Sequence, residues 1–400
     1  MGVPVMHSPQ AQAAMTLQAQ EPGDAGPRRP QTPSRAGGGP TSPGKRPLSA
    51  AGLLARRLSA AKALAPDGLP AGGGAGDRAI QSLAAGDKIY DLYYWDKVLQ
   101  EEGNGGKVVI CRPKVPGEQA SREYVMKMRS RAELRQLSLE DHFYQVMERM
   151  LNLPPHPGIV RVYEVLKDES FFYVVMEKAN GGSLFGSLIT DFKDGCMPAS
   201  AVKQVMREIL EAVGHVHKQG MLHRDIKPDN LVMQSDGGGS SGSRERKRVM
   251  LIDFDHADPE WSAGDGAGES DEVFGTLRFN APEALLSNFT PQGDLYSVGV
   301  ILYLLMTGRF PYSDETFSDA SRDVAACSWS RRRRSAVHAK MRQARVDFSS
   351  SPWPEQPACR DLCRRLLAFE VHDRPCSAEE ALRHEWFRQG ERRGSAAPLQ

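Results

Sequence analysis

The chain has 400 residues, of which 40% are hydrophobic and 25% charged, with a formal net charge of +1. This length allows one large domain or two ordinary ones. The balanced charge gives no general attraction to nucleic acid or to an anionic membrane. The six cysteines show no CxxC spacing, so we expect reduced thiols rather than disulfides or a zinc site. The longest apolar run, 298–306, is far shorter than the roughly 20 residues that span a bilayer. We therefore expect no transmembrane segment and a cytoplasmic location, with the nucleus as the alternative.

Residues 1–85 are dominated by Ala, Gly, Pro, Ser, Gln and Arg and have no sustained aromatic or β-branched pattern. Such a segment buries too little apolar surface to offset the entropy lost on ordering. We predict a disordered tail there and a second, short one at 389–400. The basic amphipathic stretch at 49–65 is interpreted as a transient helix within the first tail, with a targeting role as the alternative. The folded domain is then expected at 86–388.

The first half of this domain shows short β-like runs separated by turn residues. One helical pattern interrupts them at 139–151, where apolar side chains recur at helical spacing. The predicted strands lie at residues 90–99, 107–112, 122–128, 159–166 and 171–178.

From residue 184 onward the pattern becomes helical. The stretch at 199–220 carries an apolar stripe and ends on a glycine, and the stretch at 294–308 is apolar nearly all round, as a central buried helix should be. Strands followed by helices indicate an α+β fold with two unlike lobes. We expect an N-terminal lobe at 86–178 and a C-terminal lobe at 179–388.

A set of polar residues with fixed spacing lies at 222–230, which reads LHRDIKPDN, and the stretch MLIDFDH follows a short way on. Phosphoryl transfer needs an acceptor for the proton of the substrate hydroxyl, a positive group near the moving phosphate and an oxygen ligand for Mg²⁺. Asp225, Lys227 and Asn230 supply these three groups. Asp253, which follows the strand-like RVMLI, supplies a second carboxylate for the metal.

The wider pattern resembles the eukaryotic protein kinase family over residues 89–388. YVMK resembles the family's VAIK, which implies that Lys127 contacts the α- and β-phosphates. The motifs APE and DRP imply that Glu283 pairs with Arg374. DLYSVG resembles the family's DxWSxG and implies that Asp294 braces the backbone of the catalytic loop. The resemblance is specific because several independent motifs occur in the family's order.

The resemblance implies a bilobal kinase fold that binds ATP and Mg²⁺ and phosphorylates protein substrates. It makes Asp225 the base and Asn230 and Asp253 the ligands of Mg²⁺. VMEKANGGSL resembles the segment that joins the lobes, with backbone groups of Glu177 and Ala179 for the adenine. The implied nucleotide-binding residues are Lys127, Gly103, Gly105, Gly106, Val108, Val125, Met176, Glu177 and Ala179.

Two further features narrow the resemblance. Lys227 together with Thr276 matches the serine/threonine branch of the family rather than the tyrosine branch. The segment 345–375 is similar to the calcium/calmodulin-dependent kinase group, which includes plant and protist calcium-dependent kinases. The 400 residues contain no EF-hand pattern, so direct regulation by calcium is not expected.

The chain departs from the family's pattern at several places, one of which is Val125, where the family usually has Ala. Glu101 replaces the first glycine of the phosphate-binding loop. Asp255 replaces the glycine of DFG, which we interpret as altered switching rather than lost chemistry, since MAP-kinase-interacting kinases also carry DFD. The glutamate that should pair with the VAIK-type lysine is not evident, because the usual spacing falls on Met147. Glu148 is the favoured candidate and Glu140 the alternative.

We therefore expect an active, monomeric serine/threonine kinase. The alternative is a pseudokinase scaffold, which Glu101 and the missing glutamate suggest. Asp229 predicts a moderate preference for basic residues upstream of the acceptor, since Ser183 stands where such kinases often carry a second acid. Arg224 precedes the catalytic aspartate, and kinases of that kind neutralise this arginine with a phosphate on the activation segment. Here Glu272 is expected to supply the negative charge permanently.

Overall fold

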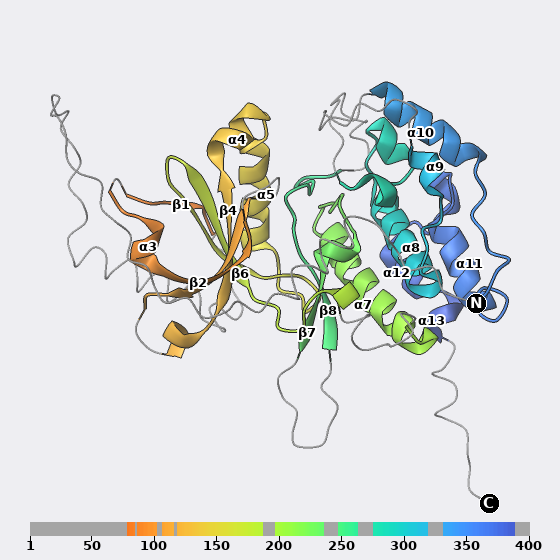
Figure 1. The fold of residues 1–400 in the computed structure, drawn as a ribbon, viewed down its shortest axis with the longest axis horizontal. Coiled ribbons are helices and arrows are strands. Elements are labelled where there is room, and N and C mark those ends of the chain that lie inside the picture. The colour runs from red at the N-terminus through yellow and green to blue at the C-terminus, as the bar shows by residue number, and fades with distance from the viewer. Residues whose placement is uncertain are drawn as a thin grey trace, which may run out of the picture. The chain divides into compact units, whose positions relative to one another are not determined.

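The N-terminal part of the chain forms a β-sheet and the C-terminal part a group of helices (Figure 1). The computed structural model describes residues 78–84, 86–101, 106–115, 118–186, 197–235, 247–262, 275–318 and 331–388. All of them belong to one structural unit of the chain. The predicted tails therefore lie almost wholly outside the described residues. The arrangement confirms the predicted α+β fold with a β-rich lobe and a helical lobe.

The sheet of the N-terminal lobe has six strands in the order β1-β5-β6-β4-β3-β2. Neighbouring strands are antiparallel, except that β1 and β5 run parallel. A one-turn helix, α3 (Ile89–Leu92), takes the place of the first residues of the predicted strand at 90–99. The strands are β1 (Gln81–Ser82), β2 (Tyr93–Gln100), β3 (Lys107–Pro113), β4 (Tyr124–Ser130), β5 (Val162–Lys167) and β6 (Phe171–Glu177).

Strand β4 lies inside the sheet, between β3 and β6, and divides its side chains between the two faces. Successive side chains of a strand point to opposite sides. Tyr124 and Met126 enter an apolar core on one face, where both are fully buried. Val125, Lys127 and Arg129 alternate with them and therefore share the other face. This second face is the one that meets the C-terminal lobe, because Lys127 contacts a carboxylate of that lobe.

Helix α5 (Glu140–Asn152) packs against the sheet beside β5 (Figure 1). It presents an apolar stripe at helical spacing, and the ring of Phe143 lies 5.2 Å from the ring of Phe172 on β6. A short helix that the sequence did not predict, α4 (Arg131–Gln136), precedes it. The hydroxyl oxygen of Ser130 caps α4 by accepting a backbone N–H of the first turn at 3.3 Å. The buried residues of α5 are Phe143, Val146, Met147, Met150 and Leu151.

The chain joins the sheet before the domain boundary that we expected at residue 86. Strand β1 pairs with β5, and Ile80 just before it is 7% exposed and packs in the main core. The backbone N–H of Arg78 donates to the side-chain oxygen of Asn152, at the end of α5, over 2.7 Å. This N-terminal segment therefore fixes the last turn of α5 to the edge of the sheet.

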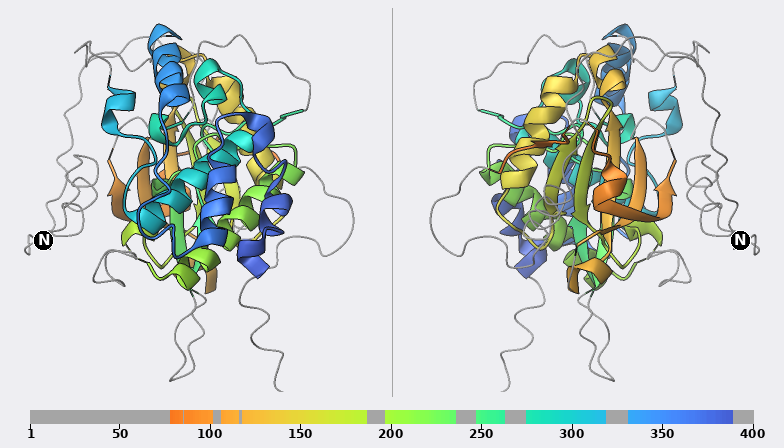
Figure 2. Two further views of the ribbon diagram at one scale, coloured as in Figure 1. Left: turned by 90° about the vertical axis from the view of Figure 1, so that its right-hand side faces the viewer. Right: turned by 90° about the vertical axis from the view of Figure 1, so that its left-hand side faces the viewer.

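Helix α8 (Pro291–Thr307) is the centre of the C-terminal lobe, and all its residues from 294 to 305 are buried. This burial confirms the central helix that the all-round apolar pattern predicted. Helices α7 and α11 pack against it, and Figure 2 shows this lobe and the sheet from opposite sides. The remaining helices are α7 (Ala199–Lys218), α9 (Asp314–Phe317), α10 (Arg331–Gln343), α11 (Pro357–Leu366), α12 (Ala378–Leu382) and α13 (Glu385–Arg388).

A two-stranded sheet, β7 (Leu231–Ser235) and β8 (Lys247–Leu251), joins the two lobes (Figure 1). The N–H of Val160, just before β5, donates to the carbonyl of Leu251 on β8 at 2.9 Å. Within the described residues, no helix combines the length and the apolar character needed to cross a bilayer. The short 3₁₀ helices are η1 (Glu118–Ser121), η2 (Pro228–Asn230), η3 (Leu277–Phe279), η4 (Glu283–Leu286) and η5 (Val371–Asp373).

Two glycines of α8 give a test of this packing. A Cβ at Gly299 would lie 2.7 Å from the Cβ of Leu366 on α11, whereas a Cβ at Gly293 would meet nothing nearer than 3.6 Å. We predict that Gly299→Ala lowers the free energy of unfolding by about 1–3 kcal/mol through overpacking. Gly293→Ala, the matched control, should be neutral or stabilising by up to ~1 kcal/mol. Denaturant unfolding of both variants measures this, and equal effects would contradict the close contact of α8 with α11.

Candidate active site

The loop between α7 and β7 carries two of the predicted catalytic residues, Asp225 and Lys227, and Asp294 of α8 holds its backbone. The Asp294 carboxylate, 3% exposed, accepts the N–H groups of His223 and Arg224, each at 2.9 Å. It also contacts the Nε2 of His217 at 2.9 Å. Burial alone would raise the pKa of Asp294, but these partners outweigh it and hold the pKa below its usual range. The prediction that Asp294 braces the catalytic loop is therefore confirmed.

The buried His223 links this loop to the segment that carries Asp253. The backbone N–H of Asp225 donates to its Nδ1 at 3.3 Å, so the proton is assigned to Nε2, which donates to the Ile252 carbonyl at 3.1 Å. The imidazole ring also packs edge-on against Phe254, with 4.6 Å between the ring centres. Burial lowers the pKa of His223, which keeps the ring neutral and able to play both roles.

The carboxylate of Asp225 is buried and receives three hydrogen bonds. Lys227 Nζ lies 2.7 Å and Asn230 Nδ2 3.1 Å from Oδ2, while the Thr276 hydroxyl lies 3.0 Å from Oδ1. Lys227 also donates to Thr276 Oγ1 over 2.8 Å. The structure therefore brings Thr276 to Asp225, Lys227 and Asn230. Thr276 lies 51 positions after Asp225 in the sequence. A fixed, charged carboxylate with a neighbouring ammonium is suited to accept a proton beside a transferring phosphate.

Gly275 allows Thr276 to reach this position. Its φ of +86° lies in the left-handed region, and a Cβ would come within 2.4 Å of the Arg224 carbonyl. The chain can therefore pass next to the catalytic loop only with glycine here. Sequence reasoning paired Thr276 with Lys227, and the structure shows the contact between them.

A buried cluster of four charges lies where the sheet meets the C-terminal lobe. Lys127 Nζ is 2.7 Å from Asp253 Oδ1 and 2.8 Å from Asp255 Oδ1. Arg129 Nε is 3.3 Å from the other oxygen of Asp255. Desolvation alone would lower the pKa of Lys127, but Asp255 and Asp253 raise it. Burial would raise the pKa of Asp253, but Lys127 outweighs this and lowers it. The site thus keeps its lysine protonated by using two carboxylates.

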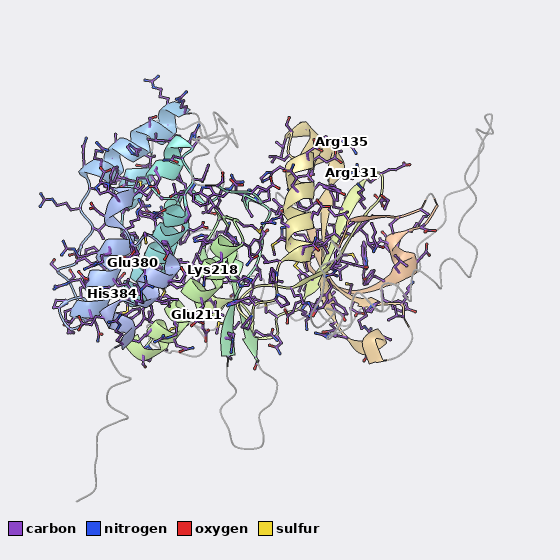
Figure 3. All side chains as sticks on the ribbon, turned by 180° about the vertical axis from the view of Figure 1, so that it is seen from behind. Arg131, Arg135, Glu211, Lys218, Glu380 and His384 are labelled. Atoms are coloured by element: carbon purple, nitrogen blue, oxygen red, sulfur yellow. The ribbon has the colours of Figure 1, made fainter. Side chains whose placement is uncertain are left out.

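The glutamate that we expected from α5 does not take part in this cluster. In the described part of the chain, Lys127 pairs with Asp253 and Asp255 and with neither Glu148 nor Glu140. Glu140 is instead held by two arginines of α4, with N–O distances of 2.6 Å to Arg131 and to Arg135. Figure 3 labels these two arginines on α4. The preference for Glu148 was therefore wrong for this structure.

Sequence reasoning also missed Arg129. The signal was present, because residues two apart in a strand share a face, so Arg129 had to lie on the side of Lys127. Arg129 also lies beside Asp255, and Asp255 occupies a position where the family usually has glycine. Asp255 and Arg129 have opposite charges, and the structure shows them as one pair.

The sheet brings together the predicted nucleotide-binding side chains. Val108 lies opposite Lys127 across β3 and β4, and Val125 lies opposite Met176 across β4 and β6. Cross-strand partners share a face, so these residues line one surface beside Lys127. Gly106, which is buried, directly precedes β3.

The loops at the two ends of this surface are only partly described. Gly103 and Gly105 lie outside the described residues. Glu101, whose side chain is 75% exposed, lies 3.2 Å from the ammonium of Lys107 at the start of β3. In the segment that joins the lobes, the N–H of Glu177 donates to the Arg161 carbonyl at 2.9 Å. A ligand can therefore use only the carbonyl of Glu177, while Ala179 follows two residues later.

The donor set at the catalytic loop fits a hard divalent cation such as Mg²⁺. Asn230 uses its amide nitrogen on the backbone carbonyl of Asp225 at 2.8 Å, which leaves the amide oxygen for a metal. Asp253, whose side chain is 34% exposed, offers a carboxylate. Among the described residues, no group of three or more His, Cys, Asp or Glu could hold a metal. Two protein oxygens suit Mg²⁺, which commonly takes its other ligands from water and phosphate.

Arg224 has several partners near the catalytic loop. It donates to the carbonyls of His256 and Ala257 at 2.7 and 3.0 Å and contacts the imidazole of His142 on α5 at 3.3 Å. Asp258 lies 3.7 Å from its guanidinium. The predicted partner Glu272 lies outside the described residues, so its role stays a prediction.

Comparison with known proteins gives one consistent answer. Residues 101–387 match the family model of the protein kinase domain. The chain is 30% identical over 302 residues to calcium-dependent protein kinase 8 of Arabidopsis thaliana, covering 74% of this chain and 50% of that protein. It is 28% identical over 297 residues to the CDPK-related protein kinase of Daucus carota, covering 73% of this chain and 44% of that protein. The chain therefore spans about half the length of the relatives it matches.

The architecture and the matches agree. A β-sheet lobe with a buried lysine, set against a helical lobe with a braced carboxylate, defines the class of bilobal kinase folds. This chain belongs to the protein kinase family. The resemblance to calcium-dependent kinases is also confirmed, since these relatives are calcium-dependent or CDPK-related kinases. The predicted ion pair of the APE and DRP motifs is present as well, because Arg374 meets Glu283 with two N–O contacts of 2.7 and 2.8 Å.

The brace of the catalytic loop can be tested by removing one charge. We predict that Asp294→Asn lowers the free energy of unfolding by about 2–4 kcal/mol, because buried N–H donors lose a charged acceptor. Asp314→Asn is the matched control, since its carboxylate is 85% exposed and pairs with Arg278 at the surface. The control should cost about 0.5 kcal/mol. Thermal unfolding compares the two, and an equally mild Asp294 variant would show that the loop needs no brace.

Proposed function

We propose that this chain is an ATP-dependent protein kinase that transfers the γ-phosphate of Mg-ATP to serine or threonine hydroxyls of proteins. The observation that carries this proposal is the buried Asp225 carboxylate with Lys227, Asn230 and Thr276 around it. The relatives support it, since they are named as kinases.

The residues of the chain have distinct roles in this reaction. Asp225 accepts the proton of the substrate hydroxyl while the hydroxyl oxygen bonds to the γ-phosphorus of ATP. The bond between the γ-phosphorus and the oxygen that bridges it to the β-phosphate breaks, and ADP leaves. Lys227 lies beside that carboxylate and stabilises negative charge on the moving group. Lys127 is placed to contact the nucleotide phosphates. Mg²⁺, held by Asn230 and Asp253, would neutralise phosphate charge when bound.

The structure weakens the two reasons for a pseudokinase. The acid at the phosphate-binding loop, Glu101, is 75% exposed to screening by solvent and has Lys107 3.2 Å away. The lysine that lacked a glutamate partner has two carboxylate partners instead. Neither departure from the family's pattern therefore removes a group that the reaction needs.

Loss of the base gives the direct test. We predict that Asp225→Asn lowers kcat about 10²- to 10⁴-fold, the usual contribution of a positioned base, while affinity for Mg-ATP changes less than about threefold. Phosphate transfer from labelled ATP to a protein substrate measures the first effect, and calorimetry measures the second. Asp373→Asn serves as a control, because this carboxylate is 62% exposed and lies outside the site. Wild-type turnover in the Asp225 variant would refute the assigned role.

We also propose a moderate preference for basic residues upstream of the acceptor. Asp229 is exposed beside the catalytic loop and can meet a cationic side chain of the substrate. Ser183, the second position, is exposed and carries no charge. One exposed charge pair contributes about 1 kcal/mol or less, so the preference should be at most about fivefold and should weaken with salt.

A positional peptide library tests this preference. Asp229→Asn should remove the enrichment of Arg and Lys upstream of the acceptor, whereas Ser183→Glu should strengthen it by adding a second carboxylate. Turnover of a peptide without basic residues should stay within about twofold of wild type in both variants. A wild-type library without enrichment of Arg or Lys would end this proposal.

A further inference from the structure

We propose that Asp255 is the residue that positions Lys127 for the nucleotide phosphates, and that Arg129 is the second cation that balances the charge of this cluster. This inference rests on the proposed function, because it assigns to Lys127 a phosphate contact. It places the partner of the lysine on the segment after β8 rather than on α5.

The contacts support Asp255 in this role more strongly than they support Asp253. Both carboxylates lie within 2.8 Å of Lys127 Nζ. They differ in exposure, because the side chain of Asp255 is 11% exposed and that of Asp253 is 34% exposed. Asp253 is the more exposed of the two and is the carboxylate assigned above to Mg²⁺. When Asp253 serves a metal, Asp255 remains as the buried partner of Lys127.

Arg129 explains how a carboxylate can persist at this buried position. One ammonium beside two buried carboxylates would leave an excess negative charge, which is strongly unfavourable in the protein interior. Arg129 supplies the second positive charge, with its Nε 3.3 Å from Asp255. Two cations and two carboxylates then balance.

Helix α5 offers no substitute for Asp255. The position at the expected spacing is Met147, which has no charge, and Glu140 is held by Arg131 and Arg135. Among the described residues, Lys127 pairs with Asp253 and Asp255 and with no acid of α5, Glu148 included. In this chain, the lysine is therefore set by strand β4 and the segment after β8. A movement of α5 should change the lysine's position little.

Binding measurements separate this role from a purely structural one. The probes are the ATP analogue AMPPNP with Mg²⁺ and adenosine, which has the same base and sugar but no phosphates. We expect Asp255→Asn to weaken AMPPNP binding at least about tenfold and adenosine binding less than about twofold. Glu148→Gln, the matched control on α5, should leave both affinities within about twofold of wild type. An Asp255 variant with wild-type affinity for AMPPNP, or an equal loss in the Glu148 variant, would overturn the proposal.

The double variant Arg129→Met/Asp255→Asn removes one charge of each sign. If Asp255 positions Lys127, this variant should regain a wild-type melting temperature yet still bind AMPPNP about tenfold more weakly. Wild-type affinity in the double variant would show that Asp255 serves only to neutralise Arg129. The double variant also carries the test if the single variant does not fold, because its charges balance.

The same measurements distinguish failure of this inference from failure of the proposed function. A wild-type protein that binds AMPPNP more tightly than adenosine, with the difference lost in Asp255→Asn, supports the positioning role even if no phosphate transfer is found. Phosphate transfer by a wild-type protein whose Asp255 variant binds and turns over normally would uphold the kinase and refute the inference.

Discussion

The site depends on keeping one buried ammonium, that of Lys127, charged and in place. A buried lysine loses hydration and would give up its proton unless carboxylates compensate. Here two aspartates of one short segment, Asp253 and Asp255, supply the compensation at 2.7 and 2.8 Å. Ion pairs between Lys127 and the two aspartates therefore connect the sheet lobe to the helical lobe, at the place where we propose that the phosphates bind. The rest of the site is arranged around that connection.

The catalytic loop is fixed by a second buried charge on the other side of the site. Asp294 holds the loop backbone, and His223 links the loop to the segment of Asp253 through Ile252 and Phe254. Asp294 belongs to α8, which is buried throughout its centre, and His223 is itself buried. The proton acceptor and the lysine therefore share one framework, and a change in the segment after β8 reaches both. This shared segment is where the chain carries its most unusual residue, Asp255.

Much of this could be predicted from the sequence, because motif spacing reports which residues share a loop. The predicted pairing of Glu283 with Arg374 is present, and Thr276, a predicted site residue, lies against Lys227 and Asp225. The partner of Lys127 could not be predicted by spacing, because the partner comes from a different element than usual. Whether two charged residues far apart in the sequence neutralise each other depends on how the fold places them. The sequence alone shows Arg129 and Asp255 only as two separate charged residues, whereas the structure pairs them. The start of the domain was missed for a similar reason, since a two-residue strand has too little pattern to detect.

One measurement tests the central claim most directly: the coupling of Lys127 and Asp255 in nucleotide binding. Affinities for Mg²⁺-AMPPNP would be determined for Lys127→Met, for Asp255→Asn and for the variant with both changes. If Asp255 acts through Lys127, the double variant should bind no more weakly than Lys127→Met alone, because the lysine's contribution is already lost. Losses that multiply, as two independent sites would give, would contradict the account.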